Sequence, residues 1–269
     1  MSHYTMVIDL TICTGCRACE AACALENQTP YWNEKYRTHV EDIVSGSFPD
    51  VERTFLPHMC MQCEDPACVE ACPTGASYIE EETGIVLINH DICIDCRYCM
   101  AACPYGARYE YTKADQKKAL EVYGEAHGQD FIDKCTLCEH RIKQGMEPAC
   151  VTTCLAGARI FGDLDDPDSE VSKLVSSGRA KPLAPEAGTR PKIYFIADDP
   201  SDLNALPVDV AAAGMARAHT ASKDIGTLGI GLATIGALGV YGYARKNAKN
   251  HFVEVAAELE KETEKEERS

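Results

Sequence analysis

The stretch Cys93-Ile-Asp-Cys96-Arg-Tyr-Cys99-Met-Ala-Ala-Cys103-Pro104 places four cysteines in twelve residues, with the spacing C-x2-C-x2-C-x3-C-P. Three thiolates at this spacing can surround three corners of one compact metal group, because the loop between them wraps around it. The fourth cysteine follows on a short helical turn that leads away, so its thiolate faces a neighbouring group. The stretch therefore predicts a metal-binding loop with a short helix directly after it.

This cysteine pattern is repeated along the chain. The 16 cysteines fall into four groups of four, with none left over. The first and third groups have identical spacing, the second widens one gap to C-x4-C, and the fourth widens it to C-x11-C. The groups are Cys13, Cys16, Cys19, Cys23; Cys60, Cys63, Cys68, Cys72; Cys93, Cys96, Cys99, Cys103; and Cys135, Cys138, Cys150, Cys154.

Composition narrows the class of protein further. The 269 residues include 26 basic and 42 acidic side chains, a net charge of −16, which argues against nucleic acid or anionic lipid as the main partner. A chain of this length does not need disulfides to stabilise its core. Residues 1–10 lack the basic and apolar regions of a secretory signal, so we expect cysteines that ligate metal rather than form disulfides.

The spacing C-x2-C-x2-C-x3-C-P is the ligand pattern of bacterial two-cluster ferredoxins, in which the fourth cysteine ligates the other cluster. Adjacent groups two and three then form one pair, and groups one and four form the other, giving four [4Fe–4S] clusters. The predicted ligand sets are Cys13, Cys16, Cys19, Cys154; Cys60, Cys63, Cys68, Cys103; Cys93, Cys96, Cys99, Cys72; and Cys135, Cys138, Cys150, Cys23. Zinc is the alternative, although zinc ribbons need neither a third nearby cysteine nor C-x3-C-P.

Short elements alternate with the cysteine groups. Apolar runs at residues 6–8, 85–88 and 192–196 predict strands, and the turn signal Glu82-Thr-Gly84 predicts a hairpin between residues 76–80 and 84–88. The segment between the third and fourth cysteine of each group predicts a short helical turn. The linkers 24–59 and 104–134 are long enough to carry structure, which the sequence does not assign. Together these features predict an α+β fold of two ferredoxin-like double-cluster modules with inserted segments.

The order of the groups and the run Leu56-Pro-His-Met-Cys60-Met-Gln-Cys63-Glu-Asp-Pro-Ala-Cys68 resemble the iron–sulfur subunit of the dimethyl sulfoxide reductase family. This family includes the β subunit of membrane-bound formate dehydrogenase, and the resemblance covers about residues 4–165. It implies electron transfer between a molybdenum or tungsten pterin catalytic subunit and a membrane quinone or haem subunit, in an anaerobic respiratory oxidoreductase. It also implies the same cross-ligation between paired groups. Leu155 departs from the family pattern, because it stands where proline usually follows the fourth cysteine.

The cysteine sites predict electron transfer without catalysis. A cluster with four thiolate ligands has no open coordination position, and the sequence contains no catalytic motif, so no catalytic residue is expected. Arg17 and Arg97 each follow the second cysteine of a group; they either raise the potential of the nearby cluster or are ordinary exposed arginines. The histidines closest to the cysteines in sequence are expected not to be ligands: His58, His90 and His140.

The C-terminal part differs in character. Residues 225–243 form 19 positions without a charged side chain, which as a helix would span about 28 Å, close to the ~30 Å hydrocarbon core of a bilayer. We expect one transmembrane helix there, the alternative being a buried glycine-rich segment. The expected domains are 1–165 with four clusters, 166–224 as extension and linker, 225–243 as the membrane helix, and 244–269 as a charged tail. A slight excess of basic residues after the helix predicts a cytoplasmic tail and an extracytoplasmic cluster domain.

Two other functions remain compatible with these features. The equivalent four-cluster subunit of a membrane-bound nickel–iron hydrogenase has a similar pattern, and only the identity of the partner would distinguish it. A soluble polyferredoxin, or a zinc-bound interaction module, is the alternative from another class. The apolar segment at 225–243 argues against a freely diffusing carrier.

Overall fold

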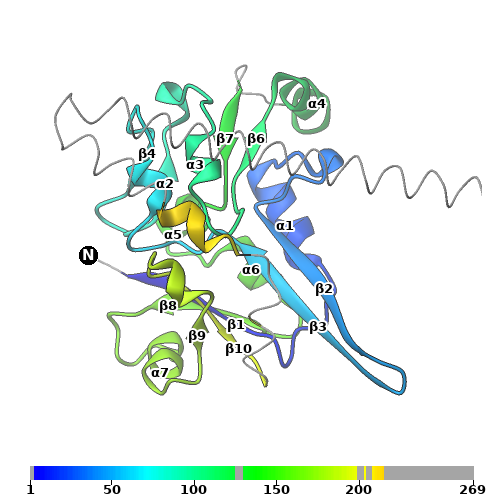
Figure 1. The fold of residues 1–269 in the computed structure, drawn as a ribbon. Coiled ribbons are helices and arrows are strands. Elements are labelled where there is room, and N and C mark those ends of the chain that lie inside the picture. Colours follow the sequence, from blue (N-terminus) through cyan, green and yellow to red (C-terminus); the bar gives the residue numbers. More distant parts are fainter. Residues whose placement is uncertain (1–2, 125–129, 199–202, 204–207, 215–269) are drawn as a thin grey trace, which may run out of the picture. The chain divides into compact units, whose positions relative to one another are not determined.

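The computed structural model describes residues 3–124, 130–198, 203 and 208–214. A four-stranded sheet is built around the strand β1 (Tyr4–Asp9), with the strand order β8-β1-β10-β9 (Figure 1). The strand β1 pairs in parallel with β10 (Ile193–Ile196) and antiparallel with β8 (Arg159–Asp163). The side chains at positions 6–8 are fully buried, which matches their uninterrupted apolar character. The strands predicted at 6–8 and 192–196 are confirmed.

The segment after residue 165 belongs to this same sheet. The short strand β9 (Lys181–Pro182) pairs with β10, and α7 (Glu170–Ser176) packs Val171 against Val7 and Ile196. One compact unit extends to Arg217. The segment expected to be an extension therefore completes the sheet around β1, because β10 supplies a neighbour for its buried edge.

The short elements near the cysteines have the predicted types. The strands β4 (Ser77–Ile79) and β5 (Val86–Ile88) pair as an antiparallel hairpin, as expected from the turn signal. A helix starts one residue before the third cysteine of every group, which confirms the predicted helical turns. These helices are α1 (Ala18–Asn27), α2 (Ala67–Glu70), α3 (Tyr98–Ala101) and α6 (Ala149–Thr152).

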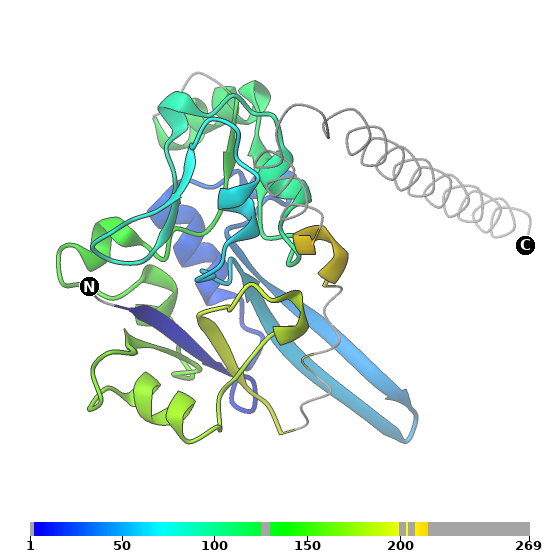
Figure 2. The same cartoon turned by 60° about the vertical axis from the view of Figure 1, so that its left-hand side comes forward.

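Both long linkers carry structure. The first contains a hairpin of β2 (Thr38–Ser47) and β3 (Asp50–Met59), paired from Thr38↔Met59 to Ser47↔Asp50 and visible as two long arrows in Figures 1 and 2. The second contains α4 (Lys113–Tyr123) between β6 (Tyr109–Tyr111) and β7 (Phe131–Asp133), which pair antiparallel. The remaining elements are η1 (Tyr31–Asn33), η2 (His90–Ile92), α5 (Glu139–Ile142) and η3 (Pro185–Ala187).

The main core lies where the sheet, the buried end of the β2–β3 hairpin and the cysteine loops meet. Most of its fully buried members come from β1, β3, β10 and the loop residues beside the cysteines, and one buried cluster contains both these side chains and four cysteines. The cysteine loops therefore form part of the core itself. The predicted membrane helix at 225–243 and the tail at 244–269 lie outside the described residues. No helix within the described ranges is long and apolar enough to cross a membrane.

Candidate iron–sulfur sites

Four cavities in the described part of the chain are each lined by four cysteines. Each site takes the number of the cysteine group that supplies three of its four cysteines. Site 1 is lined by Cys13, Cys16, Cys19, Cys154; site 2 by Cys60, Cys63, Cys68, Cys103; site 3 by Cys93, Cys96, Cys99, Cys72; and site 4 by Cys135, Cys138, Cys150, Cys23. In each site the fourth cysteine comes from another group, so the structure brings together the same sets that the sequence pattern assigns.

Each of these cavities is a space surrounded by four thiol side chains. Among the described residues, no three cysteine, histidine or acidic side chains converge tightly enough to hold one bare metal ion. The soft thiolate donors and the space between them fit an iron–sulfur cluster.

Left-handed backbone conformations turn each loop around its cavity. In the loop of site 1, Gly15 and Arg17 have φ of 64° and 59°. In the loop of site 3, which has the same cysteine spacing, Asp95 and Arg97 have φ of 51° and 63°. A Cβ at Gly15 would lie 2.4 Å from the ring of Phe55, so a larger residue is excluded there. The turned loops also point backbone N–H groups at sulfur, because Leu137 donates to the Sγ of Cys135 at 3.3 Å.

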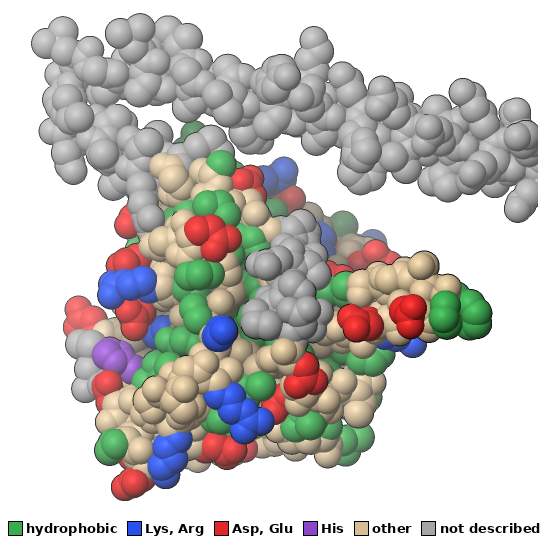
Figure 3. Space-filling model, turned by 60° about the horizontal axis from the view of Figure 1, so that its bottom comes forward, with side chains coloured by type: hydrophobic (Ala, Val, Ile, Leu, Met, Phe, Trp, Pro, Cys, Tyr) green, Lys and Arg blue, Asp and Glu red, His purple; other side chains and the backbone are tan. Residues whose placement is uncertain are grey.

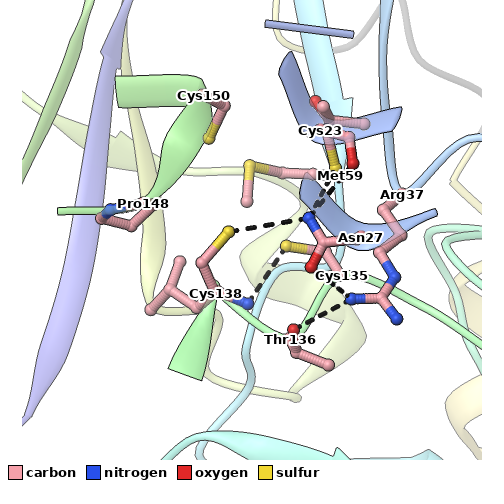
Figure 4. Close-up of a pocket in the computed structure, with 11 residues that line it drawn as sticks. Cys23, Asn27, Arg37, Met59, Cys135, Thr136, Cys138, Pro148 and Cys150 are labelled. Carbon is pink, nitrogen blue, oxygen red and sulfur yellow. Dashed lines mark hydrogen bonds between the residues drawn. The ribbon is translucent and has the colours of Figure 1, made fainter. Parts of the chain in front are cut away.

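Site 4 lies beside the guanidinium of Arg37 (Figure 4), which forms a largely buried ion pair with Asp133. Arg37 donates to Asp133 at 2.9 Å, to the Oδ1 of Asn27 at 2.8 Å and to Thr136 at 3.1 Å. Held in this way, Asn27 directs its amide Nδ2 at the Sγ of Cys23, 3.5 Å away, and of Cys138, 3.7 Å away. The asparagine side chain is therefore a donor to two sulfurs of one site.

Burial raises the pKa of several of the cysteine thiols. It raises the pKa of Cys23 to about 12, although the charge of Arg37 opposes it. Burial, with Cys68 and Cys60 nearby, raises the pKa of Cys103 to about 11. Without a cluster these thiols stay protonated at neutral pH, so metal binding must release their protons.

Two buried arginines that the sequence interpretation missed lie against the cysteine sulfurs. Arg108 donates to the Sγ of Cys68 at 2.9 Å, and Arg159 donates to the Sγ of Cys19 at 3.5 Å. Their side chains are only 5% and 4% exposed. The signal that could have identified them is the repeated Gly-Ala-Arg that ends five residues after Cys103 and Cys154.

The residues singled out in the sequence near the cysteines have different surroundings. Arg17 and Arg97 border sites 1 and 3, but both side chains are 59% exposed, with Glu20 and Glu110 as ion-pair partners. His58 is buried against the ring of His39, and this burial lowers the pKa of His58 to about 4. His140 contacts Glu26 at 2.8 Å, and His90 stacks on Phe131.

Comparisons with known proteins indicate that the chain carries 4Fe-4S clusters. Two family models, each described as a 4Fe-4S dicluster domain, match residues 51–164 and 12–77, which together span the four cysteine groups. A candidate dimethyl sulfoxide reductase iron–sulfur subunit of Halobacterium salinarum is 41% identical over 73% of this chain and 79% of its own length. A selenate reductase subunit of Mesobacillus selenatarsenatis is 40% identical over 72% of both chains. A sulfite dehydrogenase subunit of Allochromatium vinosum is 39% identical over 73% of this chain and 83% of its own length.

The fold and the cysteine sites define a ferredoxin-like protein of mixed helix and strand that carries 4Fe-4S dicluster domains. The chain belongs to the family of iron–sulfur electron-transfer subunits that includes those of dimethyl sulfoxide and selenate reductases. The resemblance inferred from the cysteine groups is confirmed. The chain is an electron-transfer subunit of an oxidoreductase rather than the catalytic subunit.

Proposed function

We propose that this chain binds four [4Fe–4S] clusters and passes electrons between a molybdenum or tungsten pterin catalytic subunit and a membrane quinone or haem subunit. The observation that carries the proposal is the set of four cavities, each lined by four cysteines. The proposed ligands are the four cysteines that line each of sites 1 to 4. When bound, each cluster would accept and release one electron at a time.

Contacts between the sites support a linear order of 1, 4, 2 and 3. Arg159 donates to Cys19 of site 1 and, at 3.6 Å, to Cys150 of site 4. Gln62, in the loop of site 2, donates at 2.8 Å to the carbonyl of Cys135 of site 4. Sites 2 and 3 meet at Arg108, which lines site 2 and donates at 2.9 Å to the hydroxyl of Ser77, a residue that lines site 3. Sites 1 and 3 are then the two ends at which electrons enter and leave.

The protein surface at these two ends suits protein partners. Near site 1, Ile12 is 45% exposed and Leu155 is 86% exposed; near site 3, Ile94 is 64% and Tyr98 is 55% exposed. The tip of the β2–β3 hairpin also gathers hydrophobic side chains, with Phe48 92% exposed (Figure 3). We place the contacts with the partner subunits at these exposed apolar side chains.

The membrane assignment rests on the sequence. We propose that residues 225–243 form a single anchoring helix, which would hold the clusters close to a membrane subunit. The proposal places the cluster domain on the extracytoplasmic side. The names of the relatives include both reductases and a dehydrogenase, so the proposed function covers electron flow in either direction.

The test is the metal content of the complex, purified anaerobically from native membranes through a tag on this chain. We expect about 16 iron atoms per chain, four per site, together with molybdenum or tungsten. The same iron with nickel would assign the chain to a hydrogenase instead. Zinc in place of iron would contradict the cluster assignment altogether.

A further inference from the structure

Three of the buried cations in the described part of the chain each lie beside two cysteine sites and form no ion pair with a carboxylate; another buried cation, Lys192, donates to the carbonyl of Gly84. The side chains of Arg159, Lys134 and Arg108 are 4%, 0% and 5% exposed. Within the part of the chain that the structure describes, their hydrogen bonds go to sulfur, hydroxyl and carbonyl groups. Arg37 differs, because its buried charge is neutralised by Asp133. A buried charge is unfavourable unless opposite charge lies nearby.

Arg108 lies between sites 2 and 3. Its guanidinium donates to the Sγ of Cys68, a site 2 cysteine, at 2.9 Å, and to the hydroxyl of Ser77, which lines site 3, at 2.9 Å. One guanidinium therefore contacts residues that line both sites.

Arg159 has the equivalent place between sites 1 and 4. It donates to Cys19 of site 1 at 3.5 Å and to Cys150 of site 4 at 3.6 Å, and Thr38 accepts a third hydrogen bond at 2.9 Å. Arg159 and Arg108 end the same Gly-Ala-Arg sequence, five residues after the last cysteine of their groups. The two arginines are therefore repeated elements of the two cysteine pairs.

Lys134 lies at the junction of sites 2 and 4. Its ammonium donates to the carbonyl of Cys135, of site 4, at 2.8 Å and to the carbonyl of Val86, which lines site 2. Gln62 joins the same two elements, since it donates to the carbonyl of Cys135 and accepts from the backbone N–H of Val86. Each of the three junctions in the order 1, 4, 2, 3 thus contains one buried cation.

We propose that Arg159, Lys134 and Arg108 are shared countercharges that raise the reduction potentials of the two clusters flanking each of them. The proposal rests on the proposed function, because it needs a cluster in each site. A cluster with four thiolate ligands becomes more negative when it accepts an electron, so a nearby buried cation stabilises its reduced form. A cation shared by two sites acts on both, which keeps neighbouring potentials close along the path.

The experiment is a redox titration of the anaerobically purified complex, followed by low-temperature electron paramagnetic resonance. The neutral variants are Arg108→Gln, Arg159→Gln and Lys134→Met, and each arginine is also changed to lysine. For each neutral variant we expect two potentials to fall, each by at least tenfold in the equilibrium constant for reduction, or 59 mV for one electron. In the lysine variants, which keep the positive charge, the two potentials should fall by no more than half as much as in the glutamine variants.

The pattern of shifts separates a countercharge from a structural role. The two potentials lowered by Arg108→Gln should differ from the two lowered by Arg159→Gln, and Lys134→Met should lower one from each pair. Arg97→Gln is the matched control, because Arg97 borders site 3 but is exposed and paired with Glu110. We expect it to change no equilibrium constant by more than twofold.

The outcomes also separate this inference from the proposed function. Four clusters whose potentials stay within the control's range in the neutral variants would overturn the countercharges and leave the proposed function intact. Fewer than four clusters in the unmodified complex would contradict the proposed function itself. If one neutral arginine variant loses iron, the other arginine, which belongs to the other pair of sites, decides the question by the same criterion.

Discussion

Replacing Cys103 with serine should damage site 2 and leave site 3 intact, although Cys103 follows Cys99 of site 3 by only four residues. The reason is that Cys103 lines the cavity of Cys60, Cys63 and Cys68, which lie 35 or more residues earlier in the chain. A serine oxygen is a poor replacement for a soft thiolate on iron. The change therefore removes one of four ligands from one site and none from the other three.

The expected loss of iron is small and countable. A site that keeps three thiolates loses between one iron atom and the whole cluster, so the content should fall from about 16 iron atoms per chain to between about 12 and about 15. The assay is iron analysis with low-temperature electron paramagnetic resonance of the purified complex. Cys68→Ser, in the same cavity as Cys103, should perturb the same signal, whereas Cys99→Ser should perturb a different one.

The three variants need no prior assignment of signals to sites. If Cys103→Ser and Cys99→Ser perturb the same signal, and Cys68→Ser perturbs a different one, the cross-ligation is refuted. A loss of all iron in Cys103→Ser, with normal iron in Cys68→Ser, would also count against it. The comparison therefore depends only on which variants share a signal.

Two further predictions concern stability. Asp133→Asn leaves the buried charge of Arg37 without its partner and should lower the free energy of unfolding by about 3–5 kcal/mol. The visible cluster absorbance should then be lost faster on heating. The control is Asp42→Asn, which removes a partner from an exposed ion pair, and equal rates of loss for the two variants would contradict this reasoning. Asp115→Asn should weaken the N-terminal cap of α4 by about 1 kcal/mol, measured by amide hydrogen exchange of that helix at pH 7. Burial would raise the pKa of Asp115, but hydrogen bonds from Lys35 and Thr112 outweigh it and lower this pKa. The contribution of the Asp115 carboxylate to the stability of α4 is therefore present above pH ~4 and is lost as the pH falls through the lowered pKa. A difference in amide exchange between Asp115→Asn and the unmodified chain that persists at pH 2 would contradict the assignment.

The elements next to the cysteines could be predicted because their causes are local. The third cysteine of each group marks where the loop ends and the helix begins, and this gave the starts of α1, α2, α3 and α6. The apolar run of β1 is buried along almost its whole length, so its composition alone identified it. In both cases a few neighbouring residues contain all the necessary information.

The inserted segments could not be predicted in the same way. Most of β2 is exposed or half-buried, so no alternating apolar pattern marks it, and β6 and β7 have three residues each. The buried arginines were missed for another reason. Charge normally predicts exposure, and Arg159 is buried by Cys19 and Thr38, more than 100 residues earlier in the chain. Only the folded chain brings these residues together.

The two pairs of sites are nested along the polypeptide like brackets. All eight cysteines that line sites 2 and 3 lie between residues 60 and 103, inside the span from Cys13 to Cys154 that sites 1 and 4 require. During synthesis the inner set leaves the ribosome complete while Cys150 and Cys154 are still missing. With the proposed ligands, the ligand sets are therefore completed in a fixed order: that of the inner pair is complete on the nascent chain, and that of the outer pair only once translation has passed Cys154.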